Sequence, residues 1–191
     1  MWHYKGCWKK LPERSNTRRL FFALWPGREL RQTISQTLMP RLQGLSGRKL
    51  SQQQWHITLA FLGNVPDEMA DCVQQQAQTI SAAPFDITLE TVGYWSRPKV
   101  VWLGAGDIPD GLQSLVSDLN TALKPCGYAP EYPDFKAHMT LMRKVTRKPK
   151  PFPVRPITWH VDQFVLVESR VDSSGSQYKI VQRWPLVVRT P

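Results

Sequence analysis

The chain repeats one order of predicted elements, and this repeat constrains its fold more than any other feature of the sequence. Each copy has an apolar strand, a helix with apolar side chains at helical spacing, and a second strand. The predicted segments are residues 20–25, 28–42 and 55–62 in the first copy and 100–103, 109–123 and 136–142 in the second. The repeat predicts an internal duplication, and 191 residues suffice for one compact unit.

The last strand of each copy carries the same pattern of His, an apolar residue, Thr and Leu. The pattern occupies residues 56–59 and 138–141, and it uses two of the four histidines in the chain. Side chains of a strand alternate between its two faces, so each histidine shares a face with the threonine two residues later. The apolar residues then face the core, and duplication would aim the two imidazoles at one point.

Two imidazoles at one point suit in-line displacement at phosphorus. A neutral histidine takes a proton from the attacking water, while a protonated histidine gives one to the departing oxygen. Threonine hydroxyls on the same face can bind phosphate oxygens. A zinc site would need three or four ligands, and neither strand offers Cys, Asp or Glu on the histidine face. We therefore expect catalysis without a metal or cofactor.

The net charge of +10 is unevenly distributed. Eleven of the 25 Lys and Arg residues lie in the first 50 positions, and residues 51–96 contain none. Six more fall within residues 143–155, which include no acid. Such blocks attract polyanions, so we expect RNA as a partner, although a basic surface also serves solubility alone. No apolar run approaches the ~20 residues of a membrane span, and no signal sequence is apparent, which predicts a cytoplasmic protein.

The cysteines and two tryptophans allow weaker predictions. Cys7, Cys72 and Cys126 show neither a paired motif nor metal-ligand spacing, so we expect free thiols. Trp95 and Trp102 flank two basic residues, a grouping that suits either base stacking or ordinary burial in the core.

Three segments together resemble a known family. Residues 19–24 read RLFFAL, residues 56–63 read HITLAFLG and residues 138–143 read HMTLMR. They are similar to the two-histidine (2H) phosphoesterase superfamily and, more closely, to the bacterial RNA 2',3'-cyclic phosphodiesterases, also called 2'-5' RNA ligases. The likeness covers residues 18–185. It implies an α+β fold of two pseudo-symmetric lobes, each an antiparallel sheet with helices outside, around a central cleft.

The resemblance also implies roles for five residues. His56 corresponds to the proton donor of the family and His138 to the proton acceptor. Thr58 and Thr140 correspond to threonines that contact the phosphate, and Arg143 corresponds to a basic contact. The chain departs from the family at two apolar positions beside the second histidine, with Ala137 in place of Pro and Met139 in place of Ile.

The leading hypothesis is an RNA 2',3'-cyclic phosphodiesterase that forms 2'-phosphates and is reversible as a 2'-5' RNA ligase. Its substrates would be RNA ends or nucleoside 2',3'-cyclic phosphates. Two alternatives stay open, a non-catalytic protein that binds RNA ends and a phosphodiesterase for 2'-5' linked oligonucleotides. We expect a monomer with one bilobal domain at residues 19–191, preceded by a basic, disordered extension at residues 1–18.

Overall fold

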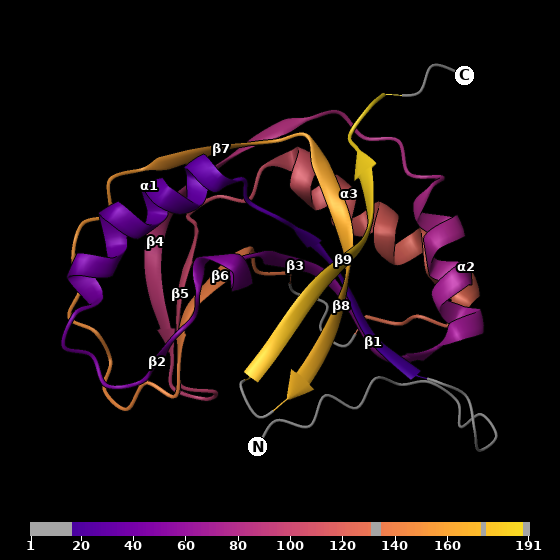
Figure 1. Ribbon diagram of the computed structural model, residues 1–191. Helices are drawn as coiled ribbons and strands as arrows, with labels where there is room; N and C mark the ends of the chain where they lie inside the picture. Colours follow the sequence, from indigo (N-terminus) through magenta and orange to yellow (C-terminus); the bar gives the residue numbers. More distant parts are fainter. Residues whose placement is uncertain (1–16, 131–134, 173–174, 189–191) are drawn as a thin grey trace.

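The computed structural model describes residues 17–130, 135–172 and 175–188. These residues form nine strands of one antiparallel sheet, three α-helices and three short 3-10 helices (Figure 1). The strands are β1 (Thr17–Leu24), β2 (Arg48–Lys49), β3 (Ile57–Pro66), β4 (Phe85–Trp95), β5 (Val100–Ala105), β6 (His138–Arg143), β7 (Ile157–Val161), β8 (Gln163–Asp172) and β9 (Gly175–Pro185). The helices are α1 (Arg28–Leu38), α2 (Asp67–Ala77), α3 (Asp110–Ala122), η1 (Met39–Leu42), η2 (Gln52–Gln54) and η3 (Lys124–Cys126).

The sheet consists of two matching halves. Its strand order is β7-β4-β5-β6-β3-β1-β8-β9, and β2 adds to β6. We call β3, β1, β8 and β9 the His56 half, and β6, β5, β4 and β7 the His138 half. One residue pair, Ile57 with Met139, joins β3 to β6 and thus connects the halves. The predicted α+β fold with two pseudo-symmetric lobes is confirmed, and the lobes share one continuous sheet.

Two helices cross from the half in which they originate to the other. Helix α1 follows β1 of the His56 half but packs against β7, and α3 follows β5 of the His138 half but packs against β3. Helix α2 packs against β1 and β3 (Figure 1). Because each half carries a helix from the other, the halves cannot separate without exposing apolar helix faces.

Helices α2 and α3 begin in the same way. Pro66 and Pro109 are the N-cap residues, and Asp67 and Asp110 follow as the first helical residues. Proline cannot continue a hydrogen-bonded strand, and an acid in the first turn is favoured by the helix dipole. Both helices bury an apolar face at helical spacing. The buried residues are Ala70, Val73 and Ala77 in α2 and Leu112, Leu115, Val116 and Leu119 in α3.

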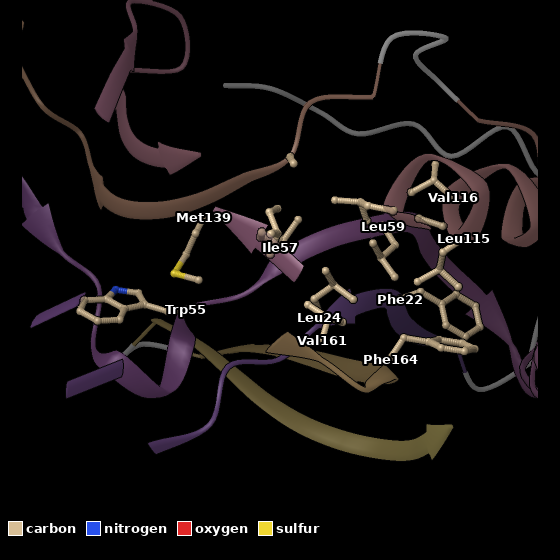
Figure 2. Packing of buried hydrophobic residues seen from close by; sticks show 14 of the residues in the cluster. Phe22, Leu24, Trp55, Ile57, Leu59, Leu115, Val116, Met139, Val161 and Phe164 are labelled. Carbon is tan, nitrogen blue, oxygen red and sulfur yellow. The ribbon is translucent and has the colours of Figure 1, made fainter. Parts of the chain in front are cut away.

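The main core lies between the sheet and its helices. Phe22, Leu24 and Phe164 fill it on the His56 side (Figure 2), and all three are almost fully buried. Ile57 and Met139, the two residues that join the halves, have no exposed surface. The buried sides of β3 and β6 are thereby anchored next to the two histidines.

The predicted elements are present with modest differences. The helix predicted over residues 28–42 ends at Leu38, and Pro40 lies in the 3-10 turn that follows it. Two strands were missed. Strand β2 has only two residues and depends on pairing with β6, while β7 follows the proline-rich segment. Of the expected N-terminal extension, only Thr17 and Arg18 are described, and they begin β1; residues 1–16 lie outside the described residues.

The prediction of free thiols is wrong for two cysteines. Cys72 of α2 and Cys126 of η3 form a disulfide, and their Cα atoms are 5.8 Å apart. They are 54 residues apart in the chain and meet because α2 packs against η3. Their sequence spacing carries no sign of this contact, which depends on tertiary packing. Cys7 lies outside the described residues.

Candidate active site

The two histidines occupy equivalent positions in the two halves. His56 directly precedes β3 and His138 begins β6. The Nδ1 atom of His56 is 2.8 Å from the carbonyl oxygen of Gln54, and Nδ1 of His138 is 2.8 Å from that of Lys136. A carbonyl oxygen only accepts, so each Nδ1 donates and each neutral ring keeps its free lone pair on Nε2. Both histidines are therefore held in the same tautomer.

The threonines lie on the histidine side of their strands, as the alternation predicts. His56 and Thr58 are partly exposed, whereas Ile57 is buried between them. In β6, His138 and Thr140 are likewise partly exposed. Residues Met139 and Leu141 beside them are fully buried. We call the side that carries these histidines and threonines the cleft face.

A β-bulge brings Arg143 to the cleft face. Thr140 pairs with Trp102 and Met142 pairs with Val101, so Leu141 is an extra residue in β6. A one-residue bulge shifts the alternation, so Met142 is buried and Arg143 is exposed on the side of Thr140. In a regular strand, a residue five positions after His138 would point the opposite way. The positive charge of Arg143 acts on both histidines.

Aromatic side chains surround His56. Trp25 is stacked on the imidazole with a centroid separation of 5.4 Å and an interplanar angle of 9°. Phe21 lies 4.8 Å away and Tyr178 of β9 contacts the ring edge-on at 5.2 Å. The guanidinium of Arg31 lies over Trp25 at 5.7 Å. Sequence reasoning missed these contacts because residues 20–25 looked uniformly apolar and Tyr178 lies far along the chain.

His138 contacts a different aromatic group. The ring of Trp95 is 4.5 Å from the imidazole and nearly perpendicular to it, and Trp95 in turn lies 5.3 Å from Trp102. Both tryptophans are partly exposed and line a pocket together with His138. Of the two interpretations weighed for this pair, simple burial in the core is therefore excluded.

Burial and a neighbouring cation keep both histidines neutral. Burial lowers the pKa of His56 from 6.5 to about 4; the bond to Gln54 opposes this shift, and the charges of Arg143 and His138 add to it. The pKa of His138 is also lowered, by burial first and by Arg143, against the bond to Lys136. An anionic ligand between the rings would oppose Arg143 and raise both pKa values. The site is thus suited to couple protonation to phosphate binding.

Comparison with known proteins identifies the family. A sequence profile described as the 2'-5' RNA ligase superfamily matches residues 28–173. The chain belongs to the 2'-5' RNA ligase superfamily. It is 31% identical over 173 residues to an RNA 2',3'-cyclic phosphodiesterase of Escherichia coli, covering 90% of this chain and 98% of that protein. A protein of the same name from Archaeoglobus fulgidus is 32% identical over 136 residues, which cover 69% of this chain and 76% of the relative.

Solved structures agree with this membership of the 2'-5' RNA ligase superfamily. The crystal structure of E. coli LigT complexed with 3'-AMP matches with a TM-score of 0.83 and 30% identity, over 90% of this chain and 99% of that one. A Thermus thermophilus protein, TT0787, shares the fold with a TM-score of 0.73 at 24% identity, covering 90% of this chain and all of that one. The family expected from the three sequence segments is confirmed.

Two residues beside His138 differ from the pattern of the family, namely Ala137 and Met139. Ala137 is nearly buried and Met139 is fully buried at the junction with Ile57. Both residues keep the apolar side of β6 covered. The substitutions therefore leave the cleft face of the strand unchanged.

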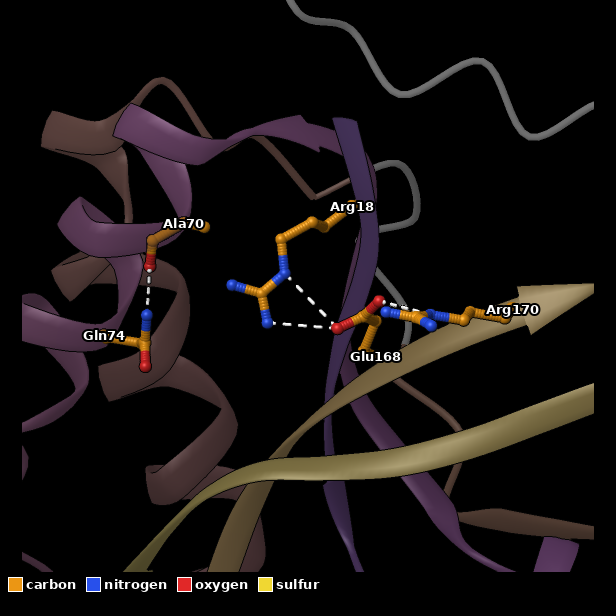
Figure 3. A network of polar contacts seen from close by, with 5 residues as sticks. All are labelled: Arg18, Ala70, Gln74, Glu168 and Arg170. Atoms are coloured by element: carbon orange, nitrogen blue, oxygen red, sulfur yellow. Dashed lines mark hydrogen bonds and ion pairs between the residues drawn. The ribbon is translucent and has the colours of Figure 1, made fainter. Parts of the chain in front are cut away.

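A larger cavity, of about 680 Å³, contains neither catalytic candidate. It lies at the start of β1, where Glu168 binds Arg18 at 3.1 Å and Arg170 at 2.8 Å (Figure 3). Hydrogen bonds from Arg170 first, and then Arg18, hold the pKa of Glu168 below its usual range. Two of the three arginines that line this cavity, Arg18 and Arg170, are thus bound to a carboxylate, which distinguishes it from the surroundings of the two histidines.

The remaining predicted features can also be located. His160 of β7 is exposed, and its Nδ1 lies 2.7 Å from Asp86, which fits the structural role expected of it. Arg147, Lys148 and Lys150 are exposed in the segment after β6. Within the described ranges, no cluster of three potential metal ligands is found. Nor does any helix in these ranges have the length and apolar character needed to cross a membrane.

Proposed function

We propose that the chain is an RNA 2',3'-cyclic phosphodiesterase that hydrolyses the cyclic phosphate to a 2'-phosphate. The supporting observation is the matched pair of imidazoles, each fixed through Nδ1 and each within range of the charge of Arg143. The shared name of the relatives from E. coli and A. fulgidus supports the same substrate.

In this mechanism His138 accepts a proton from the attacking water. The water oxygen bonds to phosphorus, the bond from phosphorus to O3' breaks, and His56 donates its proton to O3'. Thr58 and Thr140 donate hydrogen bonds to the nonbridging oxygens, and Arg143 balances their charge. The proton transfers need neither a metal nor a cofactor.

Substrate binding favours the protonated form of His56, which takes its proton from solvent. Because the pKa of His56 is about 4, the free protein holds almost no protonated His56 at neutral pH and so has no proton to donate. A bound phosphate anion offsets Arg143 and favours the charged imidazole, so the pKa of His56 rises in the complex. The negative charge of the substrate therefore helps to assemble the protonated form that reacts.

The proposed unit of function is a monomer in which residues 19–191 form the catalytic domain. The basic segment after β6 would bind the phosphates of longer RNA, and the first eighteen residues would be an extension. We propose the cytoplasm as the location of the protein. Disulfides are uncommon in that compartment, so the Cys72–Cys126 disulfide does not support this part of the proposal. With a 5'-hydroxyl attacking in place of water, the same displacement would join it to the 2',3'-cyclic phosphate through a 2'-5' linkage.

The test is an assay of nucleoside 2',3'-cyclic phosphates with identification of the product. His56→Ala and His138→Ala should each lower the rate by roughly 10²- to 10⁴-fold, the contribution of one general acid or base. His160→Ala is the matched control, because this exposed histidine binds Asp86 and lies outside the candidate site. A 3'-phosphate product would show that the departing oxygen had been misassigned, and loss of activity in EDTA, restored by zinc, would refute the metal-free mechanism. Binding of the cyclic phosphate without turnover would favour the non-catalytic alternative.

A further inference from the structure

A β-bulge in β9 turns Arg183 toward the cleft face. The pairing of β9 with β8 skips Val181, and an extra residue in a strand shifts the alternation of the side chains that follow it. Arg183 therefore lies on the same side of the sheet as Tyr178, five residues earlier, whose ring contacts His56. The bulge thus brings a cation to the side of the catalytic candidates, as another bulge does for Arg143.

Arg183 is the last member of a row of residues that crosses the His56 half of the sheet. Thr58 of β3 pairs with Ala23 of β1. Val165 of β8 pairs with Ala23 on one side and with Arg183 on the other. Directly paired residues point to one face, so the row follows the cleft face from Thr58 to Arg183. Three strand spacings, about 14 Å in all, separate the two ends of the row. Trp25 packs against the buried cluster that contains Ala23 and Val165.

Arg31 of α1 adds a second guanidinium beside Trp25. Its Cζ atom lies over the indole ring, 5.7 Å from the centroid. Burial first, and then the like charge of Arg183, lower the pKa of Arg31, although a guanidinium stays protonated at neutral pH. Within the described residues, the buried Nε of Arg31 has no hydrogen-bond partner. Arg31 is thus a cation with an unused donor.

The two arginines lack a counterion. In the ranges that the structure describes, neither Arg31 nor Arg183 forms an ion pair with a carboxylate. Arg183 has one side-chain contact, a hydrogen bond of 3.3 Å to the amide oxygen of Gln163. At the other end of β1, by contrast, Glu168 neutralises two arginines. An anion between Arg31 and Arg183 would relieve their repulsion and accept charge-assisted hydrogen bonds.

The proposed chemistry determines which anion can reach this position. His56 protonates O3', so the ribose that carries O3' lies beside this imidazole. The strand order is β6, β3, β1, β8 and β9, which places Arg183 beyond His56 as seen from His138. O2' and O3' are both bonded to the reacting phosphorus. The chain of an RNA substrate therefore continues only from O5', and its next phosphate lies on the His56 side.

We propose that Arg31 and Arg183 bind the 5'-phosphodiester of the nucleotide that carries the cyclic phosphate. This inference rests on the proposed function and adds a determinant of specificity to it. Trp25 contacts both His56 and Arg31, so the terminal nucleoside spans the indole between the reacting phosphate and the next one. The arginines thereby distinguish the end of an RNA chain from a free nucleoside cyclic phosphate. Because this contact is equal in the ground state and the transition state, it lowers KM and leaves kcat unchanged.

The experiment compares three substrates that share uridine 2',3'-cyclic phosphate. The first has a free 5'-hydroxyl, the second has a methyl phosphodiester at O5', and the third is adenylyl-(3'→5')-uridine 2',3'-cyclic phosphate. The second substrate adds the charged phosphodiester without a further nucleoside. The readout is the ratio of kcat/KM for the methyl phosphodiester to kcat/KM for the 5'-hydroxyl substrate, because a general loss of catalysis cancels in it.

The variants separate charge from structure. Arg183→Gln and Arg31→Gln each remove one cation, and Arg183→Lys keeps the charge. Lys179→Gln is the matched control, because this exposed residue of β9 pairs with Glu168 and points away from the cleft face. We expect a wild-type ratio of roughly 10 to 100, the gain from hydrogen bonds between charged groups. Each Gln variant should lower the ratio by about tenfold through KM, whereas Arg183→Lys should retain most of it. Lys179→Gln should leave it unchanged.

The other outcomes overturn the inference. A wild-type ratio near 1 would do so and leave the proposed function intact, as would a ratio that neither Gln variant lowers. Equal losses on all three substrates in both Gln variants would show that the arginines only support the site. A gain confined to the adenylyl substrate would show that the neighbouring nucleoside is bound and the phosphodiester is not. No turnover of any substrate by the wild type would refute the proposed function, and the inference with it.

Discussion

Phe61 and Arg143 occupy equivalent positions in the two halves of the sheet. Each lies five residues after its histidine, and each follows a one-residue bulge, at Leu59 in β3 and at Leu141 in β6. The bulges turn both side chains to the cleft face. The duplicated strand therefore presents an aromatic ring in one half and a cation in the other, and only Arg143 can balance a phosphate.

Replacement of Arg143 tests this asymmetry. Arg143→Gln should lower kcat/KM for a nucleoside 2',3'-cyclic phosphate by roughly 10²- to 10³-fold, as expected for loss of one transition-state contact. It should also raise the pKa of His56 and of His138, because the charge of Arg143 lowers both. NMR titration of the two imidazoles measures the shift. Lys144→Gln, at the exposed neighbour, is the control, and equal effects of the two changes would contradict the assignment.

The rate should depend on pH differently in the free and bound protein. The reactive form has one protonated and one neutral imidazole, and both pKa values are lowered in the free protein, that of His56 to about 4. This form is most abundant on the acid side of 6.5, so kcat/KM should peak there. Bound phosphate raises the pKa values, so kcat should peak at higher pH. Coincident maxima for the two parameters would argue against coupling between binding and protonation.

The exposed basic segment after β6 should act on longer RNA. Lys148→Gln removes one phosphate contact, so affinity for an oligonucleotide should fall and the slope of log affinity against log salt should decrease by about 1. Hydrolysis of a mononucleotide should be almost unaffected. Lys124→Gln, at an exposed lysine of η3, is the matched control. A similar loss on the mononucleotide would refute a separate role for the segment.

The disulfide between α2 and η3 should stabilise the fold without serving the chemistry. The Cys72 and Cys126 positions are 54 residues apart, and closing a loop of that length contributes about 4 kcal/mol in the chain-entropy description. Cys72→Ser should lower the unfolding temperature and leave turnover of the cyclic phosphate unchanged. Reductant should destabilise the wild type but not this variant. An equal response of both proteins would show that the disulfide is not formed in solution.

The sequence alone determined the elements and the two histidine strands. The alternation of His56, Ile57, Thr58 and Leu59 has the period of a strand, and burial of every second residue follows from that period. The prolines before α2 and α3 likewise act on their immediate neighbours. These features could be predicted because they depend on local geometry and on the separation of apolar from polar side chains.

Only the tertiary structure decided how the two histidine strands pair with other strands and which side chains surround the histidines. The bulge at Leu141 depends on pairing with β5, and without it Arg143 would face away from the histidines. The contact of Trp25 and Tyr178 with His56, the close approach of Trp102 to Gly93, and the Cys72–Cys126 disulfide all join residues from separate elements. Such contacts form only when the whole sheet is packed. The spacing of residues along the sequence therefore does not indicate them.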